Sequence, residues 1–128
     1  PERTTASMEK LAALGVGLVV DGFGSGSLGL RYLQALHVRT LKIDGSYLKA
    51  ISGGDVQRIV RAMIAMSQAL GLDVVLAGVE SPEQARFLKG ERGVHGQGYY
   101  LSHPLPADDV AAFLRAGNHL PVAAAAAD

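Results

Sequence analysis

The chain repeats one arrangement three times, in Asp21-Gly22-Phe23-Gly24, in Lys42-Ile43-Asp44 and in Ala77-Gly78-Val79-Glu80. Each segment follows a short apolar run and precedes a stretch in which apolar residues have helical spacing. This alternation of strand and helix predicts parallel strands, whose carboxyl ends lie at the same edge of a sheet. We therefore expect an α/β fold in which acids and a lysine gather at that edge, where such folds carry their binding and catalytic residues.

The composition fits one folded domain. The 128 residues are 48% hydrophobic, which is enough for a single core. Twelve basic residues balance twelve acidic residues, so no strong positive field favours binding to a nucleic-acid polymer. The apolar runs are far shorter than the ~20 residues of a membrane helix. The sequence contains no cysteine, which excludes disulfides and thiolate metal sites. We expect a cytoplasmic protein without direct membrane insertion.

Strand and helix patterns alternate along most of the chain. Predicted strands cover residues 16–20, 40–43, 73–77 and 97–101, and predicted helices cover residues 7–14, 28–36, 56–70, 82–89 and 106–116. Ser81, Pro82 and Gln84 mark the start of one helix, because they combine a capping-box pattern with proline at the first helical position. Glycines within residues 90–98 predict an irregular edge before the last strand.

The number of strand-helix units limits the architecture. A closed (β/α) barrel takes eight units and about 250 residues, so these four units predict about half of a TIM-like barrel. We assign residues 1–117 to this partial domain and residues 118–128 to a flexible C-terminal tail. Half a barrel leaves two sheet edges and an apolar inner face without their usual cover. Self-association or pairing with another protein chain is therefore expected.

The glycine-rich segment 24–29, Gly-Ser-Gly-Ser-Leu-Gly, is open to two explanations. It matches the dinucleotide-binding pattern G-x-G-x-x-G between a strand and a helix, with Asp44 about 20 residues further on. Against that match, Asp21 ends the strand just before the motif and would place a carboxylate near the pyrophosphate, where like charges repel. Small residues also form tight turns without any ligand, and we favour this structural explanation over nicotinamide binding.

Four strand ends carry polar motifs in a fixed order: Asp21-Gly22-Phe23-Gly24-Ser25-Gly26, Leu41-Lys42-Ile43-Asp44-Gly45-Ser46, Val75-Leu76-Ala77-Gly78-Val79-Glu80 and Gln97-Gly98-Tyr99-Tyr100-Leu101-Ser102-His103-Pro104. Together they resemble the closing half of the EAL domain family, over nearly the whole chain from about Met8 to Leu114. Members of that family are cyclic di-GMP phosphodiesterases and their non-catalytic relatives. The resemblance therefore implies a role in cyclic di-GMP signalling.

The resemblance also implies a chemistry and a set of site residues. Family members are similar to metal-dependent hydrolases that use two Mg²⁺ or Mn²⁺ ions and release the linear dinucleotide pGpG. By position, the implied residues are Asp21 and Asp44 for metal binding, Lys42 and Glu80 for catalysis, and Gln97, Tyr99 and Pro104 for nucleotide binding. Each residue also has an ordinary explanation as a helix cap, a solvated strand end, a loop hydrogen-bond partner or a packing residue.

Two departures from the family pattern bear on activity. Gly22 stands where the family has the second of two adjacent aspartates, and Ala77 stands where it has the first glutamate of E-G-V-E. Each loss removes a hard oxygen ligand and a negative charge, so metal binding should be weak or absent. We expect a degenerate cyclic di-GMP module, impaired in hydrolysis, that acts as a nucleotide receptor or regulatory domain. The alternatives are a non-binding protein-interaction remnant and, less favoured, a Rossmann-like domain.

The histidines give no separate signal for a metal site. His95 and His103 have no second histidine at metal-ligand spacing. We therefore expect them to have surface or loop roles.

Overall fold

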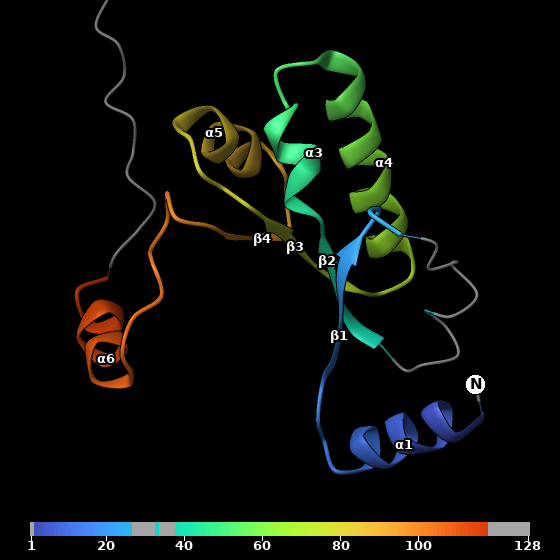
Figure 1. Cartoon of the computed structure of the whole chain (residues 1–128). Coiled ribbons are helices and arrows are strands. Elements are labelled where there is room, and N and C mark those ends of the chain that lie inside the picture. The colour runs from blue at the N-terminus through green and yellow to red at the C-terminus, as the bar shows by residue number, and fades with distance from the viewer. Residues whose placement is uncertain (1, 27–32, 34–37, 118–128) are drawn as a thin grey trace, which may run out of the picture.

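A four-stranded parallel sheet in the order β1-β2-β3-β4 forms the centre of the molecule (Figure 1). The computed structural model describes residues 2–26, 33 and 38–117. The strands are β1 (Leu18–Phe23), β2 (Val38–Ile43), β3 (Asp73–Ala77) and β4 (Val94–Gln97). The helices are α1 (Glu2–Ala13), α3 (Gly45–Lys49), α4 (Gly54–Ala69), α5 (Pro82–Gly90) and α6 (Ala107–Arg115). The predicted α/β fold with parallel strands is confirmed.

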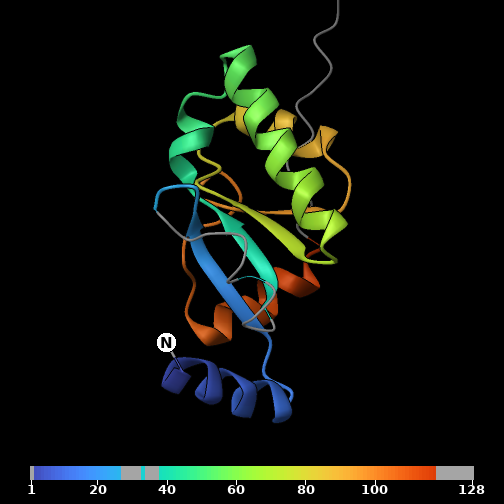
Figure 2. The ribbon, with the colours of Figure 1, turned by 90° about the vertical axis from the view of Figure 1, so that its right-hand side faces the viewer.

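One face of the sheet is covered by α3, α4 and α5, as Figures 1 and 2 show. Alternate strand residues point toward these helices, as the period of two in a strand requires. The buried core consists of Leu41, Ile43, Val74 and Leu76 from the sheet, with Leu48, Ile51, Val60, Ile64, Val79, Ala85, Phe87 and Leu88 from the helices and their connections. Burial of these side chains is the main force that holds the helices on the sheet.

The opposite face of the sheet is much more exposed. Val19 on this face is 57% exposed, and the neighbouring strands present Lys42, His95 and Gln97 there. The helices α1 and α6 contribute nothing to the core, because no residue of α6 and none of residues 5–13 of α1 is buried. Among the described residues, no helix combines the length and the apolar character needed to cross a lipid bilayer.

The helix ends follow the local sequence signals. The capping box predicted before α5 is present: the Ser81 hydroxyl accepts a hydrogen bond from the Gln84 N–H, and the Gln84 side chain accepts one from the Ser81 N–H. Pro82 occupies the start of the helix, where its missing N–H costs nothing. Gly71, with φ +72°, closes the connection after α4 because a left-handed conformation is free of strain only for glycine.

The predicted bounds of the last strand were wrong. The strand is Val94–Gln97, and the residues that follow Gln97 form a turn. The sequence predicts an irregular edge at Gly96, but a Cβ at that position would collide with the Leu88 side chain of α5. The glycine therefore permits close approach of helix and strand, which outweighs its low strand propensity.

Other differences are smaller. β1 continues through Asp21 to Phe23 instead of ending at Asp21, α1 begins at Glu2 instead of Ser7, and the short helix α3 was not predicted. The predicted helix 28–36 and the predicted tail 118–128 fall outside the described residues, apart from Leu33, which is buried.

Candidate functional site

A charged pair lies at the carboxyl end of β1 and β2. The Lys42 Nζ is 2.9 Å from the Asp21 Oδ2. The Lys42 side chain is 20% exposed and that of Asp21 is 69% exposed, so the acid lies at the solvent side of the pair. The register between β1 and β2 shifts between Val20 and Phe23, and Gly22 has φ +66°. Because Val20 pairs with Leu41, the register places Asp21 next to Lys42, and the irregularity bends the strand only beyond this point.

Asp44 lies beside this pair, and Asp21, Lys42 and Asp44 together form a charged cluster. Asp44 also caps a helix. It is the N-cap of α3, and its Oδ1 accepts a hydrogen bond of 2.9 Å from the Ser46 N–H. A Cβ built on Gly22 would lie 4.0 Å from the Asp44 Oδ2, so Asp21 and Asp44 both lie close to this glycine near the end of β1. The structure thus brings together Asp21, Lys42 and Asp44, as the strand-end argument predicted. Their metal-binding and catalytic roles stay predictions.

Both carboxyls have a pKa below the usual value. The hydrogen bond from Lys42 is the main cause that lowers the pKa of Asp21, and the nearby Asp44 charge acts weakly in the opposite direction. Hydrogen bonding from Ser46, by its side chain and then its backbone N–H, lowers the pKa of Asp44. Both groups are therefore held in the ionised form by their local contacts.

These shifts predict a loss of stability in acid. A carboxyl with a depressed pKa in the folded state contributes stability that is present above its unfolded pKa of about 4 and is lost as pH falls through the folded pKa. We expect the free energy of unfolding, measured by urea denaturation, to fall as pH decreases below about 4. Asp44→Asn should flatten this profile, because asparagine keeps the N-cap but cannot titrate. An unchanged pH profile in Asp21→Asn and Asp44→Asn would contradict the assignment.

The loops that follow β1, β2 and β3 contact one another through hydrogen bonds and backbone packing. The Tyr47 hydroxyl donates a hydrogen bond of 3.0 Å to the Gly24 carbonyl, which joins α3 to the loop after β1. Gly45 and Gly78 pack backbone against backbone, since a Cβ on Gly78 would lie 3.0 Å from the Gly45 Cα. Gly78 also has φ +76°. The loops after β1, β2 and β3 therefore form one continuous rim along the carboxyl edge.

Glu80 lies on this rim, and its carboxylate is exposed. Its backbone N–H donates a hydrogen bond of 2.6 Å to the Gln84 Oε1, which fixes the backbone of the loop. None of the hydrogen bonds or salt bridges described in the structure joins the Glu80 side chain to Lys42 or Asp21. The catalytic role predicted for Glu80 stays a prediction, and the structure places its backbone, not its carboxylate, in the bonded network.

The residues predicted to bind nucleotide lie around one cavity. Gln97, Tyr99 and Pro104 line it together with Gly98, Ser102 and His103, and its volume is about 320 Å³. The rings of Tyr99 and His103 stack, with centroids 4.4 Å apart and an angle of 20° between their planes. Tyr99 is 61% exposed, which leaves aromatic surface available to a planar ligand.

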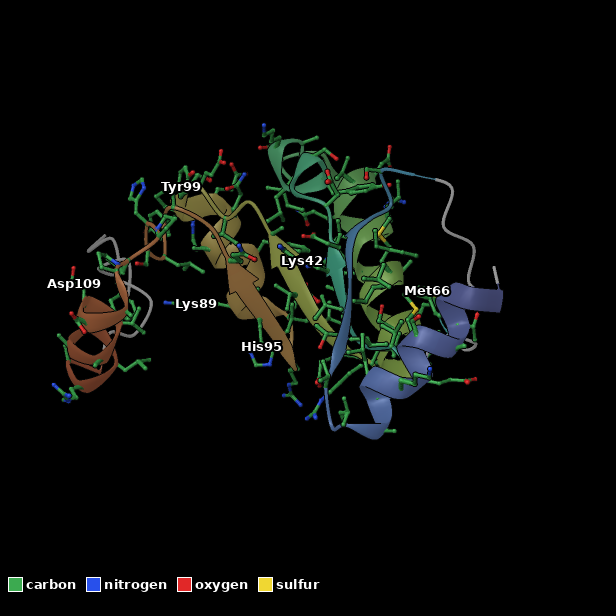
Figure 3. All side chains as sticks on the ribbon, turned by 60° about the horizontal axis from the view of Figure 1, so that its bottom comes forward. Lys42, Met66, Lys89, His95, Tyr99 and Asp109 are labelled. Atoms are coloured by element: carbon green, nitrogen blue, oxygen red, sulfur yellow. The ribbon has the colours of Figure 1, made fainter. Side chains whose placement is uncertain are left out.

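The cavity and the charged cluster lie at the same edge of the sheet. Gln97 pairs with Ala77 of β3, and Lys42 pairs with Val75 of the same strand. The strands that carry Lys42 and Gln97 are separated by two strand spacings, about 10 Å. Figure 3 shows Lys42 on β2 and Tyr99 on the loop beyond β4. A ligand that reached both would have to extend across β3.

The described residues do not fit a metal centre. No group of three or more histidine, aspartate or glutamate side chains suited to holding a metal ion occurs in the described part of the chain. Both Asp21 oxygens already have partners, Lys42 and the Gly22 N–H. A dinuclear site with magnesium or manganese needs more oxygen ligands than Asp21 and Asp44 supply.

Sequence reasoning missed three residues that matter for the site. Tyr47 holds the loop after β1, Gln84 holds the loop after β3, and His103 stacks on Tyr99. His103 was expected to have a surface or loop role, and it lies on a loop. A signal was available only for Gln84, through its capping-box position, while the contacts of Tyr47 and His103 depend on how the loops meet.

Comparison with known proteins places this arrangement in a family. The sequence profile of the EAL domain matches residues 1–104, which is most of the chain. The chain belongs to the EAL domain family. The resemblance drawn from the four strand-end motifs is thereby confirmed. This EAL domain chain is 43% identical over 117 residues to the cyclic di-GMP phosphodiesterase NbdA of Pseudomonas aeruginosa. The matched region covers 90% of this chain and 15% of NbdA.

Solved EAL structures have the same fold. The EAL domain of Mycobacterium smegmatis DcpA superposes with a TM-score of 0.83 at 35% identity, covering 92% of this chain and 53% of that one. The PaMucR phosphodiesterase in complex with c-di-GMP gives a TM-score of 0.77 at 34% identity, covering 85% of this chain and 44% of that one. The chain therefore spans about half of these EAL domains, which confirms the prediction of about half a TIM-like barrel.

Proposed function

We propose that this EAL chain is a cyclic di-GMP-binding signalling module that is impaired in hydrolysis. The observation that carries the proposal is the cavity of Gln97, Tyr99 and Pro104, which opens at the same sheet edge as Lys42. The c-di-GMP complex of PaMucR, a protein of the same fold, supports this choice of ligand. We place the module at residues 1–117 and its location in the cytoplasm.

Each part of the rim has a role in this proposal. Tyr99 stacks on a guanine base on the side not occupied by His103, because aromatic rings bind bases through their faces. The Gln97 amide, at the exposed end of β4, donates and accepts hydrogen bonds at the edge of the base. The Lys42 ammonium attracts a phosphate, while Asp21 keeps that ammonium oriented before the ligand arrives.

We propose weak hydrolysis because few carboxylates are available to bind a divalent metal ion. Gly22 and Ala77 carry no carboxylate, and Asp21 and Asp44 alone leave a divalent ion with most of its coordination to water. Mg²⁺ or Mn²⁺ would therefore bind weakly at this edge. Without a firmly held ion, no water molecule is activated for attack on phosphorus.

A calorimetric titration of cyclic di-GMP into the purified chain, with and without Mn²⁺, tests the proposal. We expect saturable binding and recovery of the intact nucleotide. Tyr99→Ala should weaken binding by roughly 5-fold to 150-fold, because loss of base stacking costs about 1–3 kcal/mol. Arg58→Ala should leave the affinity unchanged, because Arg58 pairs with Asp55 on the exposed surface of α4 and does not line the cavity. Repeated turnover to pGpG would reject impaired hydrolysis, and no binding would reject the receptor.

A second candidate function is an interaction module that binds no nucleotide. The observation that favours it is the exposed apolar surface of the outer helices and their connections: Leu14 is 79% exposed and Leu114 is 69% exposed. Such residues favour self-association or contact with another protein chain. Light scattering over a concentration series tests self-association, and a monomer at every concentration would count against it.

A further inference from the structure

Gln84 is a buried polar side chain that joins three separate parts of the rim. It is 6% exposed, and both ends of its amide are bonded. Its Oε1 accepts hydrogen bonds from the Glu80 N–H at 2.6 Å and the Ser81 N–H at 2.9 Å. Its Nε2 donates one of 2.9 Å to the Leu48 carbonyl of α3. One amide therefore connects the start of α5, the loop after β3 and α3.

The Leu48 bond leads toward the charged cluster. Leu48 lies in α3, a helix of five residues that begins at its N-cap Asp44. Tyr47 of the same helix donates its hydroxyl hydrogen bond to Gly24 in the loop after β1. A change in the position of α3 therefore shifts both Asp44 and the loop beside Asp21.

The other end of the link leads toward the nucleotide cavity. Val79 precedes Glu80 and is fully buried. Its N–H donates a hydrogen bond of 3.0 Å to the Gln97 carbonyl, and its own carbonyl accepts one of 3.0 Å from the Tyr100 N–H. These two bonds bracket Tyr99, so the position of the cavity wall follows the position of Val79.

We propose that Gln84 is a positioning residue, which holds the loop after β3 between the charged cluster and the nucleotide cavity. The ligand part of this inference rests on the proposed cyclic di-GMP function, while the structural part does not. A buried amide with a donor bond to one element and two acceptor bonds to another specifies one relative position, because any shift leaves a buried polar group without its partner.

The competing explanation is that Gln84 serves only to cap α5. Two variants separate the roles. Gln84→Glu keeps the capping box, in which glutamate is as suitable as glutamine, but it loses the Nε2 donor and sets a negative oxygen against the Leu48 carbonyl. Ser81→Ala removes the hydroxyl that caps the Gln84 N–H and leaves the amide link to Leu48 intact.

Amide hydrogen exchange and the cyclic di-GMP titration together test the proposal. In Gln84→Glu we expect the Val79 and Tyr100 amides to exchange at least about tenfold faster and the affinity to fall about fivefold to tenfold, as for residues coupled in one network. In Ser81→Ala both quantities should match the wild type. If Gln84→Glu does not fold, Gln84→Met provides a side chain of similar volume that cannot make the hydrogen bonds of the amide. It should speed up the exchange of the same two amides, Val79 and Tyr100.

The outcomes distinguish this inference from the proposed function. Unchanged exchange of Val79 and Tyr100 in the Gln84 variants would overturn the positioning role, whatever the nucleotide does. Faster exchange with unchanged affinity would overturn its link to the cavity. If the wild-type chain binds no cyclic di-GMP, the proposed function fails, and the exchange rates alone then decide whether Gln84 holds the loop.

Discussion

Gly98→Ala is expected to lower the free energy of unfolding by about 3 kcal/mol or more. A Cβ on Gly98 would collide with the backbone N, C and O of Val79. These atoms belong to the main chain and cannot rotate away as a side chain can. The two loops would have to separate, which breaks the Val79 bonds to Gln97 and Tyr100. Urea denaturation measures the loss of stability, and the cyclic di-GMP titration should show the loss of the cavity.

Gly90→Ala is the matched control for that variant. Gly90 is the last residue of α5, and a Cβ there would meet no atom within 4 Å. Its effect on the free energy of unfolding should lie within about 0.5 kcal/mol, as for most surface substitutions. Equal stability of Gly98→Ala and Gly90→Ala would show that the contact between the loops after β3 and β4 is not closed in solution.

Gly22→Asp is expected to tighten Mn²⁺ binding by about tenfold or more, which corresponds to about 1.4 kcal/mol. The new carboxylate would join Asp21 and Asp44 and raise the number of hard oxygen ligands at one point of the rim. Space is available, because a Cβ on Gly22 lies 3.4 Å from the Ser25 Oγ and 4.0 Å from the Asp44 Oδ2. The φ of +66° is strained for most residues, but aspartate is among those that adopt it.

Gly22→Asn provides the control for charge. Asparagine has nearly the same size as aspartate and tolerates the same backbone conformation, but it adds no negative charge. Calorimetric titration with Mn²⁺ should therefore separate the two variants, with the asparagine variant close to wild type. Equal Mn²⁺ affinity in both would show that the missing carboxylate at residue 22 does not limit metal binding at this edge.

Local patterns in the sequence were enough to place most of the elements. The segment from Val74 to Ala77 is predicted as a strand because it is a short apolar run bounded by turn residues. The capping box predicts the start of α5. The last strand was misplaced because its signal is not local. Gly96 is tolerated in β4 because it leaves room for the Leu88 side chain of α5 to pack against the strand. That contact joins residues from two different elements, so the sequence around Gly96 does not reveal it.

The candidate site divides in the same way. The sequence was enough to predict that Asp21, Lys42 and Asp44 lie close together, because parallel strands end at one edge and these residues stand at strand ends. Gln97, Tyr99 and Pro104 came from the family resemblance, and the structure places all three on one cavity. The stacking of His103 on Tyr99 needed the path of the loop after β4, which no periodic pattern encodes.

The sequence by itself therefore determined the fold class, the order of the strand ends and the family, since each follows from short local motifs and their order along the chain. Only the tertiary structure decided how the loops are bound to one another: the Gln84 link to Leu48, the packing of Gly98 on Val79 and the ion pair of Lys42 with Asp21. These contacts join residues that are 36, 19 and 21 positions apart, and such non-local contacts form only when the sheet brings the strand ends together.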